Sequence, residues 1–323
     1  MPSIAILATG GTIASEKQPG ADGLMPTAPA DTLVTGLEDA FANVGAHVET
    51  RQILSIDSMA ITFDDMKVML RQTLATLDAG FDAVVITHGT DTIEETALYL
   101  DAILPDKCTV IMTGAMRAST QLGADGQRNV LDSVVAAAAL CGKQVGVCVV
   151  MNGRVFAAWD VEKAHTTGVD AFRAPQGGVV GEVNELRFVP VGRPMPPYPK
   201  IGGGGDVASV ELIRCVASAS DVLIRAAVDA GVRGLIIEGL GGGHVPPVMV
   251  PALLDAMHRN MVVVVTSRTG SGLPLRAMYQ ATGAEIYLRR HGVLFSRLSG
   301  PKARILLGLV LAANHDPASV FVD

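Results

Sequence analysis

The sequence predicts an α/β protein with a larger N-terminal domain built on a parallel sheet and a smaller C-terminal α/β domain. Three observations lead to this prediction: short Val- and Ile-rich runs alternate with helical stretches, the runs are apolar throughout, and a Pro- and Gly-rich segment divides the chain. Continuous apolar runs are typical of strands covered on both faces of a sheet. Alternation of such strands with helices predicts parallel pairing.

The first half of the chain contains most of the expected elements. Strands are expected at 3–8, 47–54, 82–87, 108–113 and 145–151, and helices at 31–43, 64–79, 92–104 and 126–141. The helix over 92–104 has the clearest start, because Thr92 followed by Glu95 has the spacing of a capping box. In the second half, the pattern predicts helices near 219–230, 248–258 and 301–313 and strands at 234–238 and 261–266.

The stretch 190–205 separates these two halves and is dense in Pro and Gly. This composition is typical of a linker between domains. We therefore expect an N-terminal domain over 1–189 that carries the catalytic residues, a linker over 190–212 and a C-terminal α/β domain over 213–323.

Composition excludes several classes of protein. The 323 residues carry a formal net charge of −7, which argues against nucleic-acid binding. No apolar run approaches the roughly 20 residues that a membrane-spanning helix needs. Residues 4–8 read as a strand, not as the apolar core of a signal peptide, and the four cysteines contain no CxxC pair. We therefore expect a cytoplasmic protein in a reducing compartment, with no nucleic-acid or membrane partner.

Two threonines stand directly after glycines that follow apolar strands. Thr12 follows Gly10 and Gly11, and Thr90 follows Gly89. In open α/β sheets the carboxyl ends of the strands form the edge where ligands bind. Two hydroxyls delivered to that edge favour a nucleophilic hydrolase over a nucleotide-binding fold, because neither motif is a P-loop or a GxGxxG fingerprint.

A threonine hydroxyl is a weak nucleophile unless a base takes its proton. Asp91 lies in the same turn as Thr90, and Lys163 follows another predicted strand. A lysine drawn into a partly buried site beside a carboxylate is suited to accept that proton, whereas the alternative for Lys163 is an ordinary surface residue. For His88, a hydrogen-bonded residue at the strand end and a catalytic role both stay open.

The glycines and the segment after Thr12 also allow two interpretations each. Gly11 and Gly89 permit backbone N–H groups to approach a ligand and to stabilise an oxyanion, or they simply form tight turns. Residues 14–30 have no hydrophobic period, so they form either a mobile lid over the site or a surface excursion.

These motifs resemble those of the bacterial-type L-asparaginases, including the asparaginase–glutaminases. The resemblance covers nearly the whole chain and is most specific in the two segments 8–14 and 87–96. It implies that Thr12 attacks the side-chain amide and forms a β-aspartyl ester, while Thr90, Asp91 and Lys163 form a second triad that relays protons. The residues that it places in the substrate site are Gly11, Ser58, Met59, Gly89, Thr90, Asp91 and Ala115.

Within that site, the resemblance implies that Ser58 binds the substrate α-carboxylate, Asp91 holds the α-amino group and the Ala115 backbone touches the amide. It further implies a small-molecule amide substrate, asparagine, and no metal or organic cofactor. The family's usual assembly is a homotetramer, a dimer of dimers, in which a partner subunit completes each site.

Three departures from the family pattern concern groups that assist the nucleophile or the substrate. The segment 14–30 contains no tyrosine, Met59 stands where many members carry Gln, and His244 stands where many carry Asn. The acidic residue that some members lend across the dimer is not identified in the sequence. A lost charged hydrogen bond costs about 1.5–3 kcal/mol, so we expect recognition of the α-amino group to be weakened.

Three hypotheses of function follow. The leading one is an amidohydrolase that converts L-asparagine to L-aspartate and ammonia. The second is a broader ω-amidase or an asparaginase–glutaminase, given the altered pocket. The third is a silent amino-acid-binding protein on the same scaffold. The complete set of Thr12, Thr90, Asp91 and Lys163 argues against the third, because a binding protein needs no second threonine.

Overall fold

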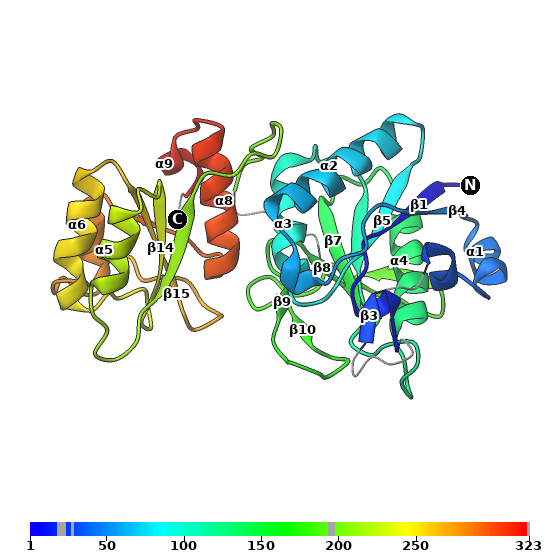
Figure 1. Ribbon diagram of the computed structural model, residues 1–323. Helices are drawn as coiled ribbons and strands as arrows, with labels where there is room; N and C mark the ends of the chain where they lie inside the picture. The colour runs from blue at the N-terminus through cyan, green and yellow to red at the C-terminus, as the bar shows by residue number, and fades with distance from the viewer. Residues whose placement is uncertain (18–23, 27–28, 193–197, 322–323) are drawn as a thin grey trace. The chain divides into compact units, whose positions relative to one another are not determined.

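The computed structural model describes residues 1–17, 24–26, 29–192 and 198–321. The chain forms two compact units, unit 1 over Met1–Met195 and unit 2 over Pro196–Asp323 (Figure 1). The predicted linker 190–212 contains this division, and strand β13 (Val210–Arg214) begins before the predicted linker ends. Among the helices in the described ranges, none has the length and apolar character needed to cross a bilayer.

Unit 1 is organised around an eight-stranded sheet in the order β12-β11-β8-β7-β6-β5-β1-β4. Its strands are β1 (Ser3–Ala8), β4 (His47–Gln52), β5 (Ala83–Thr87), β6 (Val110–Thr113), β7 (Val147–Met151), β8 (Arg154–Ala157), β11 (Gly181–Asn184) and β12 (Arg187–Pro190). The pairs from β4 to β7 are parallel, which confirms the predicted parallel sheet. The antiparallel extension through β8, β11 and β12 was not predicted.

Helices cover both faces of this sheet. They are α1 (Glu38–Val44), α2 (Phe63–Asp78), α3 (Ile93–Ile103) and α4 (Gly126–Leu140). Helices α2 and α3 pack together on one face, and α1 and α4 pack together on the other (Figure 1). The β6–α4–β7 connection is therefore opposite in hand to β5–α3–β6, an exception to the usual single hand of such crossovers. The chain reaches the other face through the long loop 114–125.

Short elements surround the carboxyl end of the sheet. They are the 3-10 turns η1 (Thr12–Ala14), η2 (Ala30–Leu33) and η3 (Ser58–Ala60), the antiparallel pair β2 (Ser15–Lys17) and β3 (Leu24–Pro26), and the pair β9 (Glu162–Lys163) and β10 (Phe172–Arg173). The single helix predicted over 31–43 is wrong. Gly36, at φ +80°, separates η2 from α1, and a continuous right-handed helix does not accommodate that dihedral angle.

Unit 2 contains a parallel four-stranded sheet in the order β13-β14-β15-β16. Its other elements are α5 (Val222–Asp229), β14 (Gly234–Gly239), η4 (Pro247–Met249), α6 (Val250–His258), β15 (Val262–Ser267), α7 (Glu285–Arg290), β16 (Leu294–Phe295), α8 (Gly300–Ala312) and α9 (Pro317–Val320). The strands and α5, α6 and α7 share one apolar core, which includes Leu235, Ile237, Leu253, Val263 and Leu288. The predicted smaller α/β domain is confirmed.

Candidate active site

Three neighbouring strands of unit 1 end at the same level. Ala8 of β1 is paired with Thr87 of β5, and Thr87 is paired with Thr113 of β6. The interior of all three strands is apolar and buried, so their registers are fixed by the core beneath the site. The polar and glycine residues that follow these strands are therefore brought to one edge.

Glycines allow the backbones at this edge to touch. A Cβ atom on Gly11 would lie 2.4 Å from the Gly89 Cα, and one on Gly89 would lie 2.5 Å from the Ser58 Oγ. The Gly11 backbone also has φ +79°, which disfavours any residue with a side chain. These contacts place the turn that leads into Thr12 directly against the turn that leads into Thr90, with Ser58 on the other side of Gly89.

Thr90, Asp91 and Lys163 form a hydrogen-bonded cluster. The Lys163 ammonium donates to the Thr90 hydroxyl at 2.9 Å and to the Asp91 carboxylate at 2.6 Å. The Asp91 side chain is 63% exposed and that of Lys163 only 16%, and Thr90 is buried. The lysine thus approaches the site from the protein side, and its cation faces the hydroxyl that the sequence analysis singled out.

Glu94 positions the strand that carries this lysine. Its carboxylate accepts the Lys163 backbone N–H at 2.6 Å, and β10 pairs with β9 on the other side. Glu94 lies in the first turn of α3, where a negative charge also complements the helix dipole. The sequence analysis missed this role, since the contact joins residues 69 positions apart.

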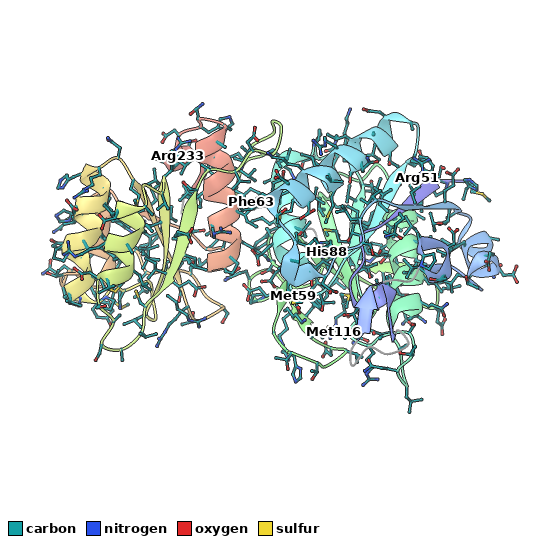
Figure 2. All side chains as sticks on the ribbon, viewed as in Figure 1. Arg51, Met59, Phe63, His88, Met116 and Arg233 are labelled. Atoms are coloured by element: carbon teal, nitrogen blue, oxygen red, sulfur yellow. The ribbon has the colours of Figure 1, made fainter. Side chains whose placement is uncertain are left out.

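Ser58 connects η3 to the start of α3. Its hydroxyl accepts the Asp91 backbone N–H at 3.2 Å, and its carbonyl accepts the Thr92 hydroxyl at 2.9 Å. The predicted Thr92 capping box is therefore wrong, because the threonine side chain bonds Ser58 and does not cap the helix. Ser58 is buried, while the neighbouring Met59 side chain is 82% exposed (Figure 2).

Ala115 is buried at the beginning of the long loop after β6. The Asp125 carboxylate accepts the backbone N–H groups of Met116 and Arg117 at 2.9–3.1 Å. The Asn129 amide donates to the Gly114 carbonyl and to Asp125, both at 3.0 Å. Two side chains one helical turn apart thus hold the backbone on either side of Ala115, a role that the sequence analysis did not assign.

His88 is fully buried at the end of β5 (Figure 2). Its Nδ1 lies 2.7 Å from the Gly89 carbonyl and its Nε2 lies 3.1 Å from the Thr96 hydroxyl. Burial lowers the pKa of His88 to about 4, although the hydrogen bond to Gly89 partly opposes this effect. The imidazole is therefore neutral at physiological pH, which favours the first of its two predicted roles.

Thr12 opens η1 and is half-buried. The predicted lid begins two residues later, and its residues 18–23 and 27–28 lie outside the described ranges. The four tyrosines of the chain are at positions 99, 198, 279 and 287, so none belongs to the predicted lid.

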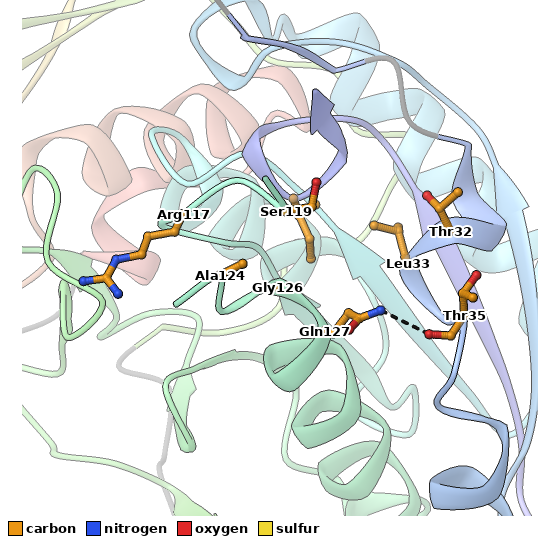
Figure 3. A pocket seen from close by; sticks show the side chains of 9 residues that line it. Thr32, Leu33, Thr35, Arg117, Ser119, Ala124, Gly126 and Gln127 are labelled. Atoms are coloured by element: carbon orange, nitrogen blue, oxygen red, sulfur yellow. Dashed lines mark hydrogen bonds between the residues drawn. The ribbon is translucent and has the colours of Figure 1, made fainter. Parts of the chain in front are cut away.

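A separate cavity of about 430 Å³ lies on the other side of Ile13 from Thr12, between η2 and the loop 114–125. Its polar lining includes Gln127, which donates to the Thr35 carbonyl at 3.1 Å, while the Arg117 guanidinium points away from Thr32 (Figure 3). None of the predicted catalytic residues lines this cavity, so we do not assign the chemistry to it.

His244 of unit 2 lies beside a buried carboxylate. Its Nε2 is 3.3 Å from Glu285, whose other oxygen accepts the backbone N–H groups of Met278 and Tyr279 at 2.6 Å each. Burial raises the pKa of Glu285, but these backbone bonds, one from its own N–H and that of His244 lower it further, so the net pKa is below the usual value. Glu285 is thus an anion that supports the His244 ring.

Comparison with known proteins places both units in one family. Residues 3–190 match the family described as "Asparaginase, N-terminal", and residues 209–321 match the "Glutaminase/Asparaginase C-terminal domain". The chain is 34% identical over 336 residues to the "Probable L-asparaginase" of Deinococcus radiodurans, covering 100% of this chain and 98% of the relative. It is 31% identical over 330 residues to the "L-asparaginase" of Bacillus licheniformis, covering 97% and 96%.

A solved structure agrees with this assignment. It is the "Probable Cytoplasmic L-asparaginase" of Campylobacter jejuni, which aligns with a TM-score of 0.84 at 28% identity and covers 98% of this chain and 97% of its own. Both family matches and both relatives extend over nearly the full length of the sequence. The chain therefore belongs to the asparaginase family, whose N-terminal and C-terminal domains it contains.

Proposed function

We propose that this protein is an L-asparaginase, an amidohydrolase that converts L-asparagine to L-aspartate and ammonia. The observation that carries the proposal is the Thr90–Lys163–Asp91 cluster, which lies in a turn packed against the Gly11 turn that leads into Thr12. Membership of the asparaginase family supports the substrate class. A cluster of this kind supplies what a threonine nucleophile needs, a partner for its proton.

The reaction proceeds in two steps through an ester. The Thr12 oxygen attacks the carbon of the side-chain amide, the C–N bond breaks, and ammonia leaves with the proton that Thr12 gives up. A water molecule then attacks the β-aspartyl ester, its oxygen becomes part of the new carboxylate, and Thr12 regains its proton. Thr90 and Lys163 relay these protons, because their hydrogen bond lies beside the turn that carries the nucleophile.

The same edge binds the substrate. Ser58 is proposed to hold the α-carboxylate and Asp91, the more exposed acid, the α-amino group. Gly11, Gly89 and Ala115 contribute backbone groups, and Met59 borders the pocket.

Ammonia release by the purified protein tests this proposal. We expect wild type to hydrolyse L-asparagine, and both Thr12→Ala and Thr90→Ala to lose at least about 10²-fold in kcat, a typical effect of losing acid–base or nucleophilic groups. Thr120→Ala is the matched control, because Thr120 is an exposed threonine of unit 1 with no proposed role. A wild-type protein that releases no ammonia from any amide would refute the enzyme assignment.

A second candidate function is a broader ω-amidase or an asparaginase–glutaminase. The observation that favours it is the exposed thioether of Met59 beside Ser58, which offers no strong hydrogen bond to the α-amino side of a substrate. The ratio of kcat/KM for asparagine to that for succinamic acid, which lacks the amino group, distinguishes the two functions. A ratio near unity supports the broader enzyme, and a large preference for asparagine supports the narrow one.

We also propose a homo-oligomer, a dimer of dimers, in which unit 2 of a partner subunit completes each site. The anionic Glu285 behind His244 makes this pair the candidate for the acidic group that family members lend across the dimer. Mixing unfolded Thr12→Ala and Glu285→Gln chains and refolding them together tests this arrangement. Recovered activity in the mixture supports shared sites, whereas additive residual activities would exclude them.

The proposed location is the cytoplasm. The neighbour from Campylobacter jejuni, which is described as cytoplasmic, supports this proposal. Fractionation of the native host with an antibody against the protein tests it, and recovery in the periplasmic fraction would contradict it.

A further inference from the structure

His88 is a buried titratable residue to which the proposed mechanism assigns no role. It is 0% exposed, and its main chain lies between two strand ends. Its backbone N–H donates to the Thr113 carbonyl at 2.7 Å, and a Cβ on Gly114 would lie 2.5 Å from the His88 carbonyl oxygen. On the other side, a Cβ on Gly11 would lie 3.1 Å from the His88 carbonyl carbon. The residue therefore lies where the two threonine turns meet.

The hydrogen bonds of the ring define its protonation. The Gly89 carbonyl can only accept, so Nδ1 of His88 carries the proton of the 2.7 Å bond. In the neutral ring Nε2 is then an acceptor, and the Thr96 hydroxyl donates to it at 3.1 Å. Burial lowers the pKa of His88 to about 4, so this arrangement holds across the physiological range.

The bond from Nδ1 determines the direction of the next peptide group. The Gly89–Thr90 peptide is trans, so its carbonyl and its N–H point in opposite directions. With the carbonyl held by the His88 ring, the Thr90 N–H points away from that ring. Across the described part of the chain, this N–H donates to no protein acceptor, although Thr90 is buried. A buried donor of this kind is available to a ligand.

We propose that His88 is a positioning residue, whose neutral imidazole holds the Gly89–Thr90 peptide so that the Thr90 N–H points at the carbonyl oxygen of the amide that Thr12 attacks. The inference rests on the proposed function and adds to it a residue outside the proton relay. A preorganised N–H stabilises the negative charge that develops on that oxygen. His88 itself neither gives nor takes a proton during the reaction.

Three substitutions separate the two hydrogen bonds from the ring's volume. His88→Phe keeps the volume and removes both bonds. His88→Asn places an amide Nδ2 at the same number of bonds from Cβ as Nδ1, so it retains a donor for Gly89. Thr96→Val removes only the partner of Nε2. We expect kcat to fall about 100-fold in His88→Phe, as for the loss of an oxyanion donor, with KM within threefold of wild type.

The other two variants should be milder. We expect His88→Asn to stay within about tenfold of the wild-type kcat and Thr96→Val within about threefold, because the bond to Gly89 survives in both. The pH profile of kcat/KM should be unchanged in His88→Asn. Thermal unfolding of each variant shows whether a loss of activity is merely a loss of folded protein.

Specific results would overturn the inference. A His88→Phe enzyme with wild-type kcat would show that the peptide needs no imidazole. A folded His88→Asn enzyme as inactive as His88→Phe, or one that has lost a limb of the pH profile, would show that the ring transfers protons.

A measurement without turnover separates this inference from the proposed function. ¹⁵N NMR of the imidazole in wild type should show a neutral ring with the proton on Nδ1 down to pH 5. A proton on Nε2, or titration near pH 6.5, would overturn the inference even in an active enzyme. Conversely, the expected spectrum in a protein that hydrolyses no amide would refute the proposed function alone.

Discussion

Replacement of Gly11 by alanine isolates the contact between the two threonine turns. An alanine Cβ would lie 2.4 Å from the Gly89 Cα and 2.5 Å from the Gly89 nitrogen. Carbon atoms in contact prefer about 3.5–4.0 Å, so one backbone has to move by about 1 Å. Gly36 is the matched control, because its φ of +80° equals the +79° of Gly11 within a degree and no atom lies within 4 Å of an added Cβ.

The two variants share one cost and differ in the other. A left-handed backbone costs an L-residue about 1–2 kcal/mol, so Gly36→Ala should lose about that much free energy of unfolding and keep its kcat/KM. Gly11→Ala should lose an additional 1–3 kcal/mol or so from overpacking. It should also lose about 100-fold in kcat/KM, the usual effect of a 1 Å displacement in a catalytic site.

Urea unfolding and ammonia release from L-asparagine measure the two quantities. A 100-fold loss corresponds to about 2.7 kcal/mol of transition-state stabilisation, well above the error of either assay. If Gly11→Ala retained a kcat/KM within threefold of Gly36→Ala, the close approach of the turns would have no catalytic importance and the reasoning would be wrong.

Four further predictions concern the proton relay, its support, the buried histidine and the pocket. Lys163→Met should lower kcat by about 10²–10⁴-fold, the range of general acid–base effects, whereas Lys143→Met at an exposed lysine should leave it unchanged in the same assay. Glu94→Ala should lower kcat about tenfold by releasing the Lys163 N–H, a bond worth roughly 1.5 kcal/mol, and Glu94→Gln, which keeps an acceptor, should restore most of it. The pKa of His88, about 4 when folded against 6.5 when unfolded, means that unfolding takes up a proton as the pH falls from 6.5 to 4; the stability it contributes is complete above pH 6.5, and the free energy of unfolding should drop by about 3 kcal/mol across that window, a drop absent from His88→Asn in urea titrations. Met59→Gln should raise the preference for asparagine over succinamic acid by about tenfold in kcat/KM if the missing polar group weakens α-amino recognition, and an unchanged ratio would remove Met59 from specificity.

Local patterns in the sequence were sufficient to predict the strands that carry the site. The runs ending at Ala8, Thr87 and Thr113 are apolar, short and followed by glycine, and each is a strand with the predicted C-terminal end. Parallel pairing then brings their ends together, so the meeting of the two threonine turns follows from topology.

Contacts between distant segments were beyond such patterns. Thr92 has a capping-box spacing, yet its hydroxyl bonds the Ser58 carbonyl, a partner 34 positions away that competes with the helix end. The supports of Lys163 and Ala115, which are Glu94 and the pair Asp125 and Asn129, depend equally on tertiary packing. Sequence patterns thus predicted the chemical groups, and only the folded chain shows what holds them in place.

The most direct test of the account identifies the residue that carries the ester. Wild-type enzyme and L-asparagine are mixed, quenched in acid within milliseconds, and digested for peptide mass mapping. The account predicts an adduct of one aspartyl group on the peptide that contains Thr12, and its absence in Thr12→Ala. An adduct on Thr90, or rapid ammonia release with no adduct on either threonine, would contradict it.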